Sequence, residues 1–264
     1  MNDQQFAAAR HALAEARRAA RRIDPVAPEW VPQGLDEAFR LQGAVAADLG
    51  STRGWKVSAV TADQQRQLGL ECPIAGALLE PWIRPSGGSF ELARFIAPRL
   101  ECEFAFELKH DLPGRQAPWS RAEVEAAIGA LRIVIEVVDS RLPPGSPVWL
   151  ELADDLNNGG FVVGPATPDW RGVRYAQQAI VLRGPRDGAP SAELARGTGA
   201  AVLDGDPVGA VVLLANLASM RRRGLRAGDI VTTGSCTGAL PVTQAGDYEA
   251  DFGALGSVRI RLAA

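Results

Sequence analysis

From Gly54 onward, the sequence consists mainly of short apolar runs, each interrupted by glycine or proline. They read GWKVSAV, AGALLEPWI, FIAPRLECEFAFEL, LRIVIEVVDSR, GGFVVG, QAIVLRG, GDIVTTGSC and GSVRIRLAA. Runs this short, rich in Val, Ile and aromatic residues and bounded by turn residues, are typical of β-strands. We therefore expect residues 54–264 to form a β-rich domain, because the chain offers many strands but few helices to cover them.

Helical signals concentrate at the N-terminus and in two later segments. Apolar residues at helical spacing and capping residues predict helices at 4–22, 35–49, 120–131 and 206–224. Ser120 with Glu123 forms a capping box, and Asp206 and Gly224 are suited to the two ends of the last helix. The sequence thus predicts an N-terminal helical segment, residues 1–53, followed by the β-rich domain.

The rare residues exclude several chemistries. Of the 28 basic residues, 26 are Arg, and the histidines are His11 and His110. A three-His zinc site is therefore impossible, and we expect both histidines at the surface. The three cysteines lie far apart without a CxxC pair, so neither a disulfide framework nor a redox pair is encoded.

Charge and hydropathy limit the partners. A net charge of −3 argues against nucleic acid as the main partner. No stretch reaches the ~18–20 apolar residues of a membrane span. The N-terminus lacks the apolar core and cleavage site of a secretory signal. With free thiols and no export signal, the chain is predicted to be cytoplasmic.

The strongest local signal is an acidic strand at residues 101–108. In a strand, side chains alternate between faces, so Glu101, Glu103 and Glu107 project to one side, with Ala105 between them. The opposite face is apolar. An exposed face of an edge strand would explain the pattern equally well.

A further glutamate, Glu136, interrupts a continuous apolar run at residues 131–139. That run is typical of a strand buried on both faces, where an unpaired carboxylate is costly. Together with Glu101 and Glu103, Glu136 would suit a hard divalent ion such as Mg²⁺ or Mn²⁺, because all the ligands are oxygens. The alternative is a buried ion pair of Glu136 with Arg132 or Arg141.

Lys56 and two glycine-bearing turns add further candidates. Lys56 lies in an apolar β-like stretch, and lysine, unlike arginine, can shuttle protons near neutral pH. The turns at 157–164 and 233–238 could bring backbone N–H groups close to an anionic ligand. Neither turn matches a nucleotide-binding fingerprint.

In this order the motifs resemble those of the 2-keto-4-pentenoate hydratase and 4-oxalocrotonate decarboxylase family, within the fumarylacetoacetate hydrolase superfamily. The motifs are GWK, GALLE, ECEFAFELKHDL, IEVVDSR, NNGGFVVG, GDPVGAVVLLANLA, AGDIVTTGSCTGALPV and ADFGALGSV. The resemblance runs from about Leu35 to the C-terminus. It implies an α+β fold, a mixed β-sandwich roll with an N-terminal helical segment, and a homo-oligomer.

The resemblance also implies roles for individual residues. Glu101, Glu103 and Glu136 would hold Mg²⁺ or Mn²⁺, and Lys56 and Glu80 would be catalytic. Substrate contacts would come from Leu79, Asn157, Asn158, Gly159, Gly160, Ser235 and Thr237. Glu80 stands where the family usually has Asp, and Asn157 and Asn158 stand where it has two serines.

The leading hypothesis is a metal-dependent lyase that adds water to a small 2-hydroxydienoate or 2-keto-enoate, giving a 4-hydroxy-2-oxo acid, as in the catabolism of aromatic compounds. A decarboxylase of a 2-oxo-enedioate is the alternative, since it shares the enolate chemistry. Hydrolysis of a carbon–carbon bond ranks third, because no histidine lies between His11 and His110 to assist a water. A non-catalytic relative of the same fold is the remaining hypothesis.

Overall fold

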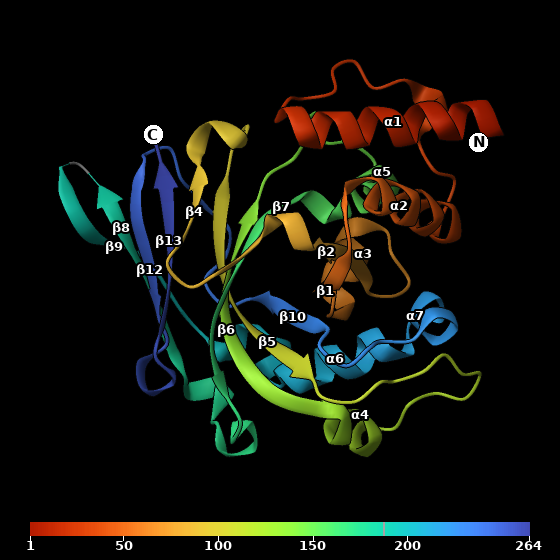
Figure 1. The fold of residues 1–264 in the computed structure, drawn as a ribbon. Coiled ribbons are helices and arrows are strands. Elements are labelled where there is room, and N and C mark those ends of the chain that lie inside the picture. Colours follow the sequence, from red (N-terminus) through yellow and green to blue (C-terminus); the bar gives the residue numbers. More distant parts are fainter. Residues whose placement is uncertain (187) are drawn as a thin grey trace.

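The computed structural model describes residues 1–186 and 188–264, which form two β-sheets flanked by helices (Figure 1). The helices are α1 (Asp3–Ala19), α2 (Leu35–Leu49), α3 (Ala62–Leu68), α4 (Arg121–Ala127), α5 (Val148–Ala153), α6 (Pro207–Asn216) and α7 (Ala218–Arg223). The strands are β1 (Thr52–Ser58), β2 (Ile74–Leu79), β3 (Ile83–Pro85), β4 (Gly88–Glu91), β5 (Arg99–Leu108), β6 (Ile128–Val138), β7 (Asn158–Thr167), β8 (Ala179–Arg186), β9 (Ala189–Thr198), β10 (Ile230–Ser235), β11 (Leu240–Pro241), β12 (Gly246–Asp251) and β13 (Ser257–Ala263). The predicted α+β class is confirmed.

The larger sheet has the strand order β2, β1, β10, β5, β6, β7 and β3, with β11 also paired to β5. Strands β5 and β6 are its long antiparallel centre, and both curve strongly (Figure 1). Strand β1 pairs in parallel with β10 and antiparallel with β2. Gly54 permits the close approach of β1 to β10, because a Cβ there would lie 2.0 Å from the carbonyl oxygen of Ile230.

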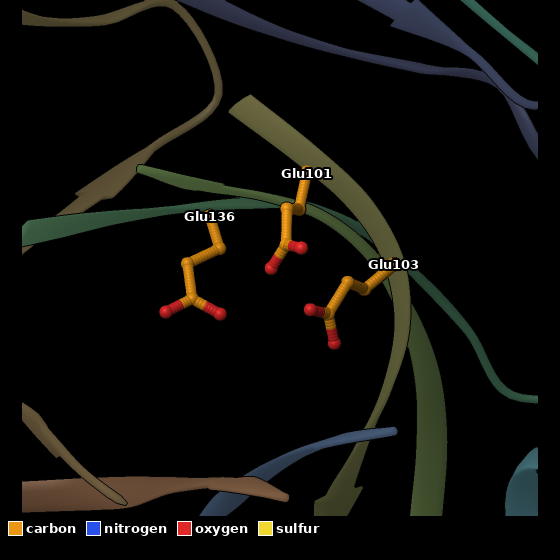
Figure 2. Close-up of side chains that lie close together, drawn as sticks. All are labelled: Glu101, Glu103 and Glu136. Atoms are coloured by element: carbon orange, nitrogen blue, oxygen red, sulfur yellow. The ribbon is translucent and has the colours of Figure 1, made fainter. Parts of the chain in front are cut away.

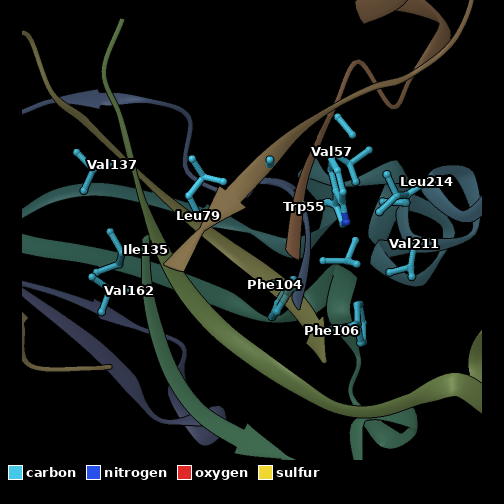
Figure 3. Packing of buried hydrophobic residues seen from close by; sticks show 14 of the residues in the cluster. Trp55, Val57, Leu79, Phe104, Phe106, Ile135, Val137, Val162, Val211 and Leu214 are labelled. Atoms are coloured by element: carbon cyan, nitrogen blue, oxygen red, sulfur yellow. The ribbon is translucent and has the colours of Figure 1, made fainter. Parts of the chain in front are cut away.

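The smaller sheet, in the order β4, β13, β12, β8 and β9, lies beside the curved strands β6 and β7 (Figure 1). Apolar side chains of β6 and β7 such as Ile135, Val137 and Val162 are fully buried in the main core (Figure 3). Farther along the same core, helix α6 packs on β5 and β1, and Phe104, Phe106, Trp55 and Leu214 belong to the same cluster (Figure 3). One apolar core therefore supports both sheets.

The N-terminal helices pack onto this core. Leu13 of α1 and Leu41 of α2 are buried in the same cluster as the sheet residues. Helix α2 has the predicted bounds, and α1 begins with a capping box at Asn2 and ends before Ala20, whose backbone is left-handed. The division into residues 1–53 and 54–264 stays a prediction.

Three predicted helices were too long, and the one predicted at 4–22 ends at Ala19. The helix predicted at 120–131 is α4, which ends at Ala127, because the next residues pair with β5 and begin β6. The helix predicted at 206–224 is divided at Leu217, whose backbone is extended, into α6 and α7. The Asn216 side chain accepts from the Trp119 N–H and donates to its carbonyl, and this stabilises the break.

Helices α3 and α5 were not predicted, because each has no more than two turns. Helix α5 nevertheless packs on α2 and leads into the short 3₁₀ turn at Asp155–Asn157 that precedes β7. Within residues 1–186 and 188–264, no helix combines the length and apolar character that crossing a bilayer requires.

Candidate active site

Strands β5 and β6 bring three glutamates together. Glu101 lies directly opposite Glu136 across the strand pair, and Glu103 follows two residues later on the same face. One carboxylate oxygen from each residue lies within 4.8 Å of those of the other two (Figure 2). Glu103 and Glu136 are buried, and Glu101 is partly exposed. We call these three residues the glutamate cluster.

Lys56 reaches the glutamate cluster from β1. Its Nζ lies 2.7 Å from Oε1 of Glu136 and donates to the carbonyl oxygen of Leu156 at 3.2 Å. Gly76, directly opposite Lys56 on β2, makes room for this contact, since a Cβ there would lie 2.5 Å from the carbonyl oxygen of Asp155. Arg132 and Arg141, the alternative partners for Glu136, instead bind Glu107 and Asp154.

The electrostatics of the glutamate cluster are unbalanced. Burial, followed by the charges of Glu136 and Glu101, raises the pKa of Glu103 to about 8. Burial also raises the pKa of Glu101, although Lys56 opposes the effect. Burial alone would lower the pKa of Lys56, but the nearby carboxylates, Glu136 first, raise it above its ordinary value. Among the described residues, Lys56 is the cation whose charge acts on all three carboxylates, and Arg99 adds a smaller effect on Glu101.

A divalent cation fits these residues. Oxygen-only ligands suit Mg²⁺ or Mn²⁺, and a doubly charged ion would relieve the repulsion among the three carboxylates. Oε2 of Glu136 is buried and has no hydrogen-bond partner in the described parts of the chain. A buried carboxylate oxygen without a partner is costly, so this atom is well suited to bind a cation.

The turn after β10 borders the glutamate cluster. The backbone N–H of Gly234 donates to Oε2 of Glu103 at 2.9 Å, and Ser235 lies opposite Glu103 in the strand pairing. Oγ of Ser235 is buried and has no partner among the described residues, so it is available to a ligand. Thr237 lies farther along, where its Oγ1 accepts from the N–H of Cys102 and donates to the carbonyl of Gly238.

The turn before β7 contributes one direct contact. Nδ2 of Asn158 donates to Oε1 of Glu136 at 3.0 Å. Asn157 precedes it with a positive φ, and its Oδ1 is buried with no partner in the described segments. Gly159 packs tightly against Asp139, and Gly160 packs tightly against the ring of Phe90.

The structure does not bring two predicted residues, Glu80 and Leu79, to the glutamate cluster. Glu80 follows the end of β2 with its side chain about half exposed, and its carboxylate binds Arg53 at 2.9 Å. Leu79 is fully buried in the main core, in a different cluster from its neighbour Leu78. Leu78 packs with Ala105, which shares a strand face with Glu101 and Glu103.

Sequence reasoning missed Arg17, a buried residue near the end of α1. Its guanidinium binds Asp155 at 2.8 Å and Oδ1 of Asn158 at 3.0 Å, so it lies one side chain away from Glu136. A signal was present in the sequence. Arg17 lies four residues after Leu13 and eight after Ala9, and this helical spacing places it on the buried face of the helix.

Curated proteins similar to this chain are hydratases and decarboxylases. No family model matches the sequence. The chain is 31% identical to the 2-keto-4-pentenoate hydratase of Burkholderia vietnamiensis (strain G4 / LMG 22486), over 98% of this chain and 97% of the relative. It is 29% identical to the 4-oxalocrotonate decarboxylase of Pseudomonas putida, over 79% of this chain and 76% of the relative.

Solved structures of similar proteins share the fold of this chain. The 4-oxalocrotonate decarboxylase from Pseudomonas putida G7, complexed with magnesium and adipate, superposes with a TM-score of 0.84 and 26% identity, covering 99% of this chain and 98% of that one. The fumarylpyruvate hydrolase from Pseudomonas aeruginosa, in complex with Mn²⁺ and pyruvate, shares the fold with a TM-score of 0.56 and 18% identity, over 80% of this chain and 89% of that one.

The curled sheets and the neighbouring structures define a fold of the fumarylacetoacetate hydrolase superfamily. The similarity to hydratases and decarboxylases extends along most of the sequence, with identities near 30%. The chain belongs to the 2-keto-4-pentenoate hydratase and 4-oxalocrotonate decarboxylase family of lyases.

Proposed function

We propose that the protein is a divalent-metal-dependent hydratase that adds water to a small 2-hydroxydienoate or 2-keto-enoate and releases a 4-hydroxy-2-oxo acid. The observation that carries this proposal is the glutamate cluster, with the buried Lys56 bound to the buried Glu136 at 2.7 Å. The membership in a family of hydratases and decarboxylases supports it.

Glu101, Glu103 and Glu136 would hold Mg²⁺ or Mn²⁺. When bound, the cation supplies positive charge that favours enolate formation from a 2-oxo acid. The protein contributes a rigid cradle, since Glu103 accepts from the N–H of Gly234 and Glu136 accepts from Asn158. These hydrogen bonds fix the two carboxylates before any ligand arrives.

Lys56 is suited to move protons. An ammonium group has three N–H donors, and two of them are directed to Glu136 and to the carbonyl of Leu156. The third remains for the substrate. Lys56 is protonated at neutral pH, and a cation on the three glutamates would weaken the carboxylate charges that raise its pKa, so that the ammonium could give a proton to C5 of the dienol as the 2-hydroxyl proton leaves. The neutral amine left behind would take one proton from the water whose hydroxyl adds at C4, and C3 would take up a proton in place of the one released from the 2-hydroxyl, so that one water is added in all.

The experiment is a hydration assay with 2-hydroxypenta-2,4-dienoate and Mn²⁺, followed by the loss of dienol absorbance. We expect turnover by the wild type and loss of both Mn²⁺ binding and turnover in Glu101→Gln. Glu107→Gln, on the same strand face but bound to Arg132, serves as the control and should retain both. Normal Mn²⁺ binding and hydration by Glu101→Gln would show that the cation site is misassigned.

A cavity next to the glutamate cluster favours decarboxylation as the second candidate. It has a volume of about 300 Å³ and is lined by Arg22, Arg99 and Val138, among others. Arg99 lies two residues before Glu101 on the same strand face, and Val138 lies two residues after Glu136. Two arginines at this position suit the far carboxylate of a 2-oxo-enedioate. Release of CO₂ from such a substrate, measured beside the hydration assay, decides between the two reactions.

A non-catalytic relative of the same fold would not bind the cation, and this distinguishes it from the proposed hydratase. Calorimetric titration of Mg²⁺ in the presence of oxalate or pyruvate should show binding if the proposal is correct. No binding with or without the anion would favour the non-catalytic alternative.

The proposal includes a small 2-keto acid as substrate and a homo-oligomer as the working form. Among the large apolar side chains of the described residues, Leu68 alone is strongly exposed. Contacts between subunits must therefore be made by polar or half-exposed side chains. Size-exclusion chromatography with light scattering measures the number of subunits.

A further inference from the structure

Arg17 is a charged residue enclosed by the protein. Its side chain is 3% exposed, and the ring of Trp82 lies 4.5 Å from its guanidinium carbon. Burial, followed by the charge of Arg141, lowers its pKa to about 10, so the guanidinium is still charged at neutral pH. An arginine buried this deeply must be held by hydrogen bonds that compensate for its lost hydration.

One of these hydrogen bonds determines the orientation of Asn158. Nη2 of Arg17 donates to Oδ1 of Asn158, and a guanidinium has no acceptor. The oxygen of the Asn158 amide must therefore face Arg17, which leaves Nδ2 to donate to Oε1 of Glu136. With Lys56 on the same Oε1, the other oxygen of Glu136 is left without a partner among residues 1–186 and 188–264.

The second hydrogen bond holds the backbone beside Lys56. Nη1 of Arg17 binds Asp155, whose Oδ1 accepts from the N–H of Ala77 on β2. The next residue, Leu156, supplies the carbonyl that accepts from Lys56. Asp155, Leu156 and Asn157 have φ values of 52°, 51° and 63°, a conformation that non-glycine residues rarely adopt. Such a turn persists only when surrounding contacts hold it in place.

We propose that Arg17 is a positioning residue: through Asn158 and Asp155, it orients Glu136 for the cation and places Lys56 for proton transfer. This inference rests on the proposed function. It gives the N-terminal helix α1 a role in the active site, although Arg17 itself touches neither the cation nor the substrate.

The test compares Arg17→Met with Arg18→Met, the same change one residue along α1. Arg18 is exposed and binds Glu15 and the carbonyl of Asp48. Mn²⁺ binding to the metal-free full-length protein is measured by calorimetry, and folding by circular dichroism. We expect Arg17→Met to bind Mn²⁺ about tenfold more weakly, with a lower kcat, because the change releases Asn158, and direct partners of metal ligands commonly contribute about 10–100-fold. Arg18→Met should bind within twofold of the wild type.

Asn158→Ser and the double variant show whether the effect passes through Asn158. Serine lacks an amide that could join Arg17 to Glu136, so Asn158→Ser alone should also weaken Mn²⁺ binding. The loss of Mn²⁺ affinity in the double variant should be smaller than the product of the two single losses, because both changes interrupt the same contact between Arg17 and Glu136 through Asn158. If Arg17→Met does not fold, Arg17→Lys, which keeps the charge but loses the forked donor, takes its place.

The inference is overturned if a folded Arg17 variant binds Mn²⁺ within twofold of the wild type. It is also overturned if the loss of Mn²⁺ affinity in the double variant equals the product of the losses in the two single variants. Failure of the proposed function has a different signature. In that case the wild type itself would bind no Mn²⁺ or hydrate no dienoate, whatever residue stands at position 17.

Discussion

Replacing Glu103 by glutamine is expected to stabilise the metal-free protein and to abolish its cation binding. Glu103 is buried in β5 beside Glu101 and Glu136, with Lys56 as the nearby cation. Glutamine has the shape of a protonated glutamate, and its side-chain oxygen can still accept from the N–H of Gly234. The change therefore removes a charge that the metal-free fold disfavours while it retains the packing.

The magnitude follows from the pKa of Glu103, which is about 8 in the folded protein instead of the ordinary 4.5. Between these values the native state binds more protons than the unfolded state, so its stability falls as the pH rises from 4.5 to 8 and then levels off. At about 1.4 kcal/mol per pKa unit, the free energy of unfolding at pH 7 is about 3 kcal/mol lower than it would be if Glu103 kept its ordinary pKa in the folded protein. Glu103→Gln should recover most of this difference.

The assay is urea unfolding of EDTA-treated protein at pH 5, 7 and 8.5, followed by tryptophan fluorescence. The free energy of unfolding of Glu103→Gln should exceed that of the wild type only slightly at pH 5, and the difference should grow toward pH 8. Mn²⁺ at 100 times its Kd should add about 2.7 kcal/mol to the wild type and nothing to the variant. Glu107→Gln, which removes a glutamate from the same strand face outside the glutamate cluster, serves as the control. A metal-free Glu103→Gln less stable than the wild type at pH 7 would refute the reasoning.

Three further predictions concern other residues. Lys56→Met should lower kcat by about 10²–10⁴-fold, because a proton donor is lost. It should not weaken Mn²⁺ binding, because it removes a positive charge close to the cation site. Steady-state kinetics test the first part and calorimetry the second. Asp154→Ala should lower the free energy of unfolding by about 3–5 kcal/mol, because it leaves the buried Arg141 without its carboxylate; urea unfolding measures the loss. The hydrogen bond from Arg115 lowers the pKa of Glu123 to about 2, so its ionised form stabilises the fold above pH 4.5 and this contribution disappears as the pH falls to 2. Glu123→Gln should therefore show a smaller fall in Tm across that window, and an unchanged fall would contradict the assignment.

The local parts of this molecule could be predicted from the sequence. Alternation along β5 placed Glu101 and Glu103 on one face, and the apolar run around Glu136 correctly predicted a buried strand. These inferences succeeded because they depend on neighbours within a few residues. The all-oxygen ligand set already suggested a hard divalent ion, and the resemblance to a known family then supplied the reaction, which no periodicity could provide.

Long-range contacts could not be predicted in this way. The end of α4 at Ala127 is decided by pairing with β5, and the break at Leu217 by contacts of Asn216 with Trp119. The pairing of Lys56 with Glu136 joins residues 80 positions apart. The exposed position of Glu80 likewise depends on the tertiary fold, because the motif GALLE does not show which way its last side chain points.

The strand order of the larger sheet has a consequence for synthesis. The site takes Lys56 from β1, its glutamates from β5 and β6, and Ser235 from β10, the strand that lies between β1 and β5. A nascent chain therefore cannot present the complete site until β10 has left the ribosome and inserted between two strands made much earlier. Closing such long loops is slow compared with local folding. The three glutamates of β5 and β6 can therefore meet early in synthesis, whereas Lys56 and Ser235 join them only once the whole sheet has closed.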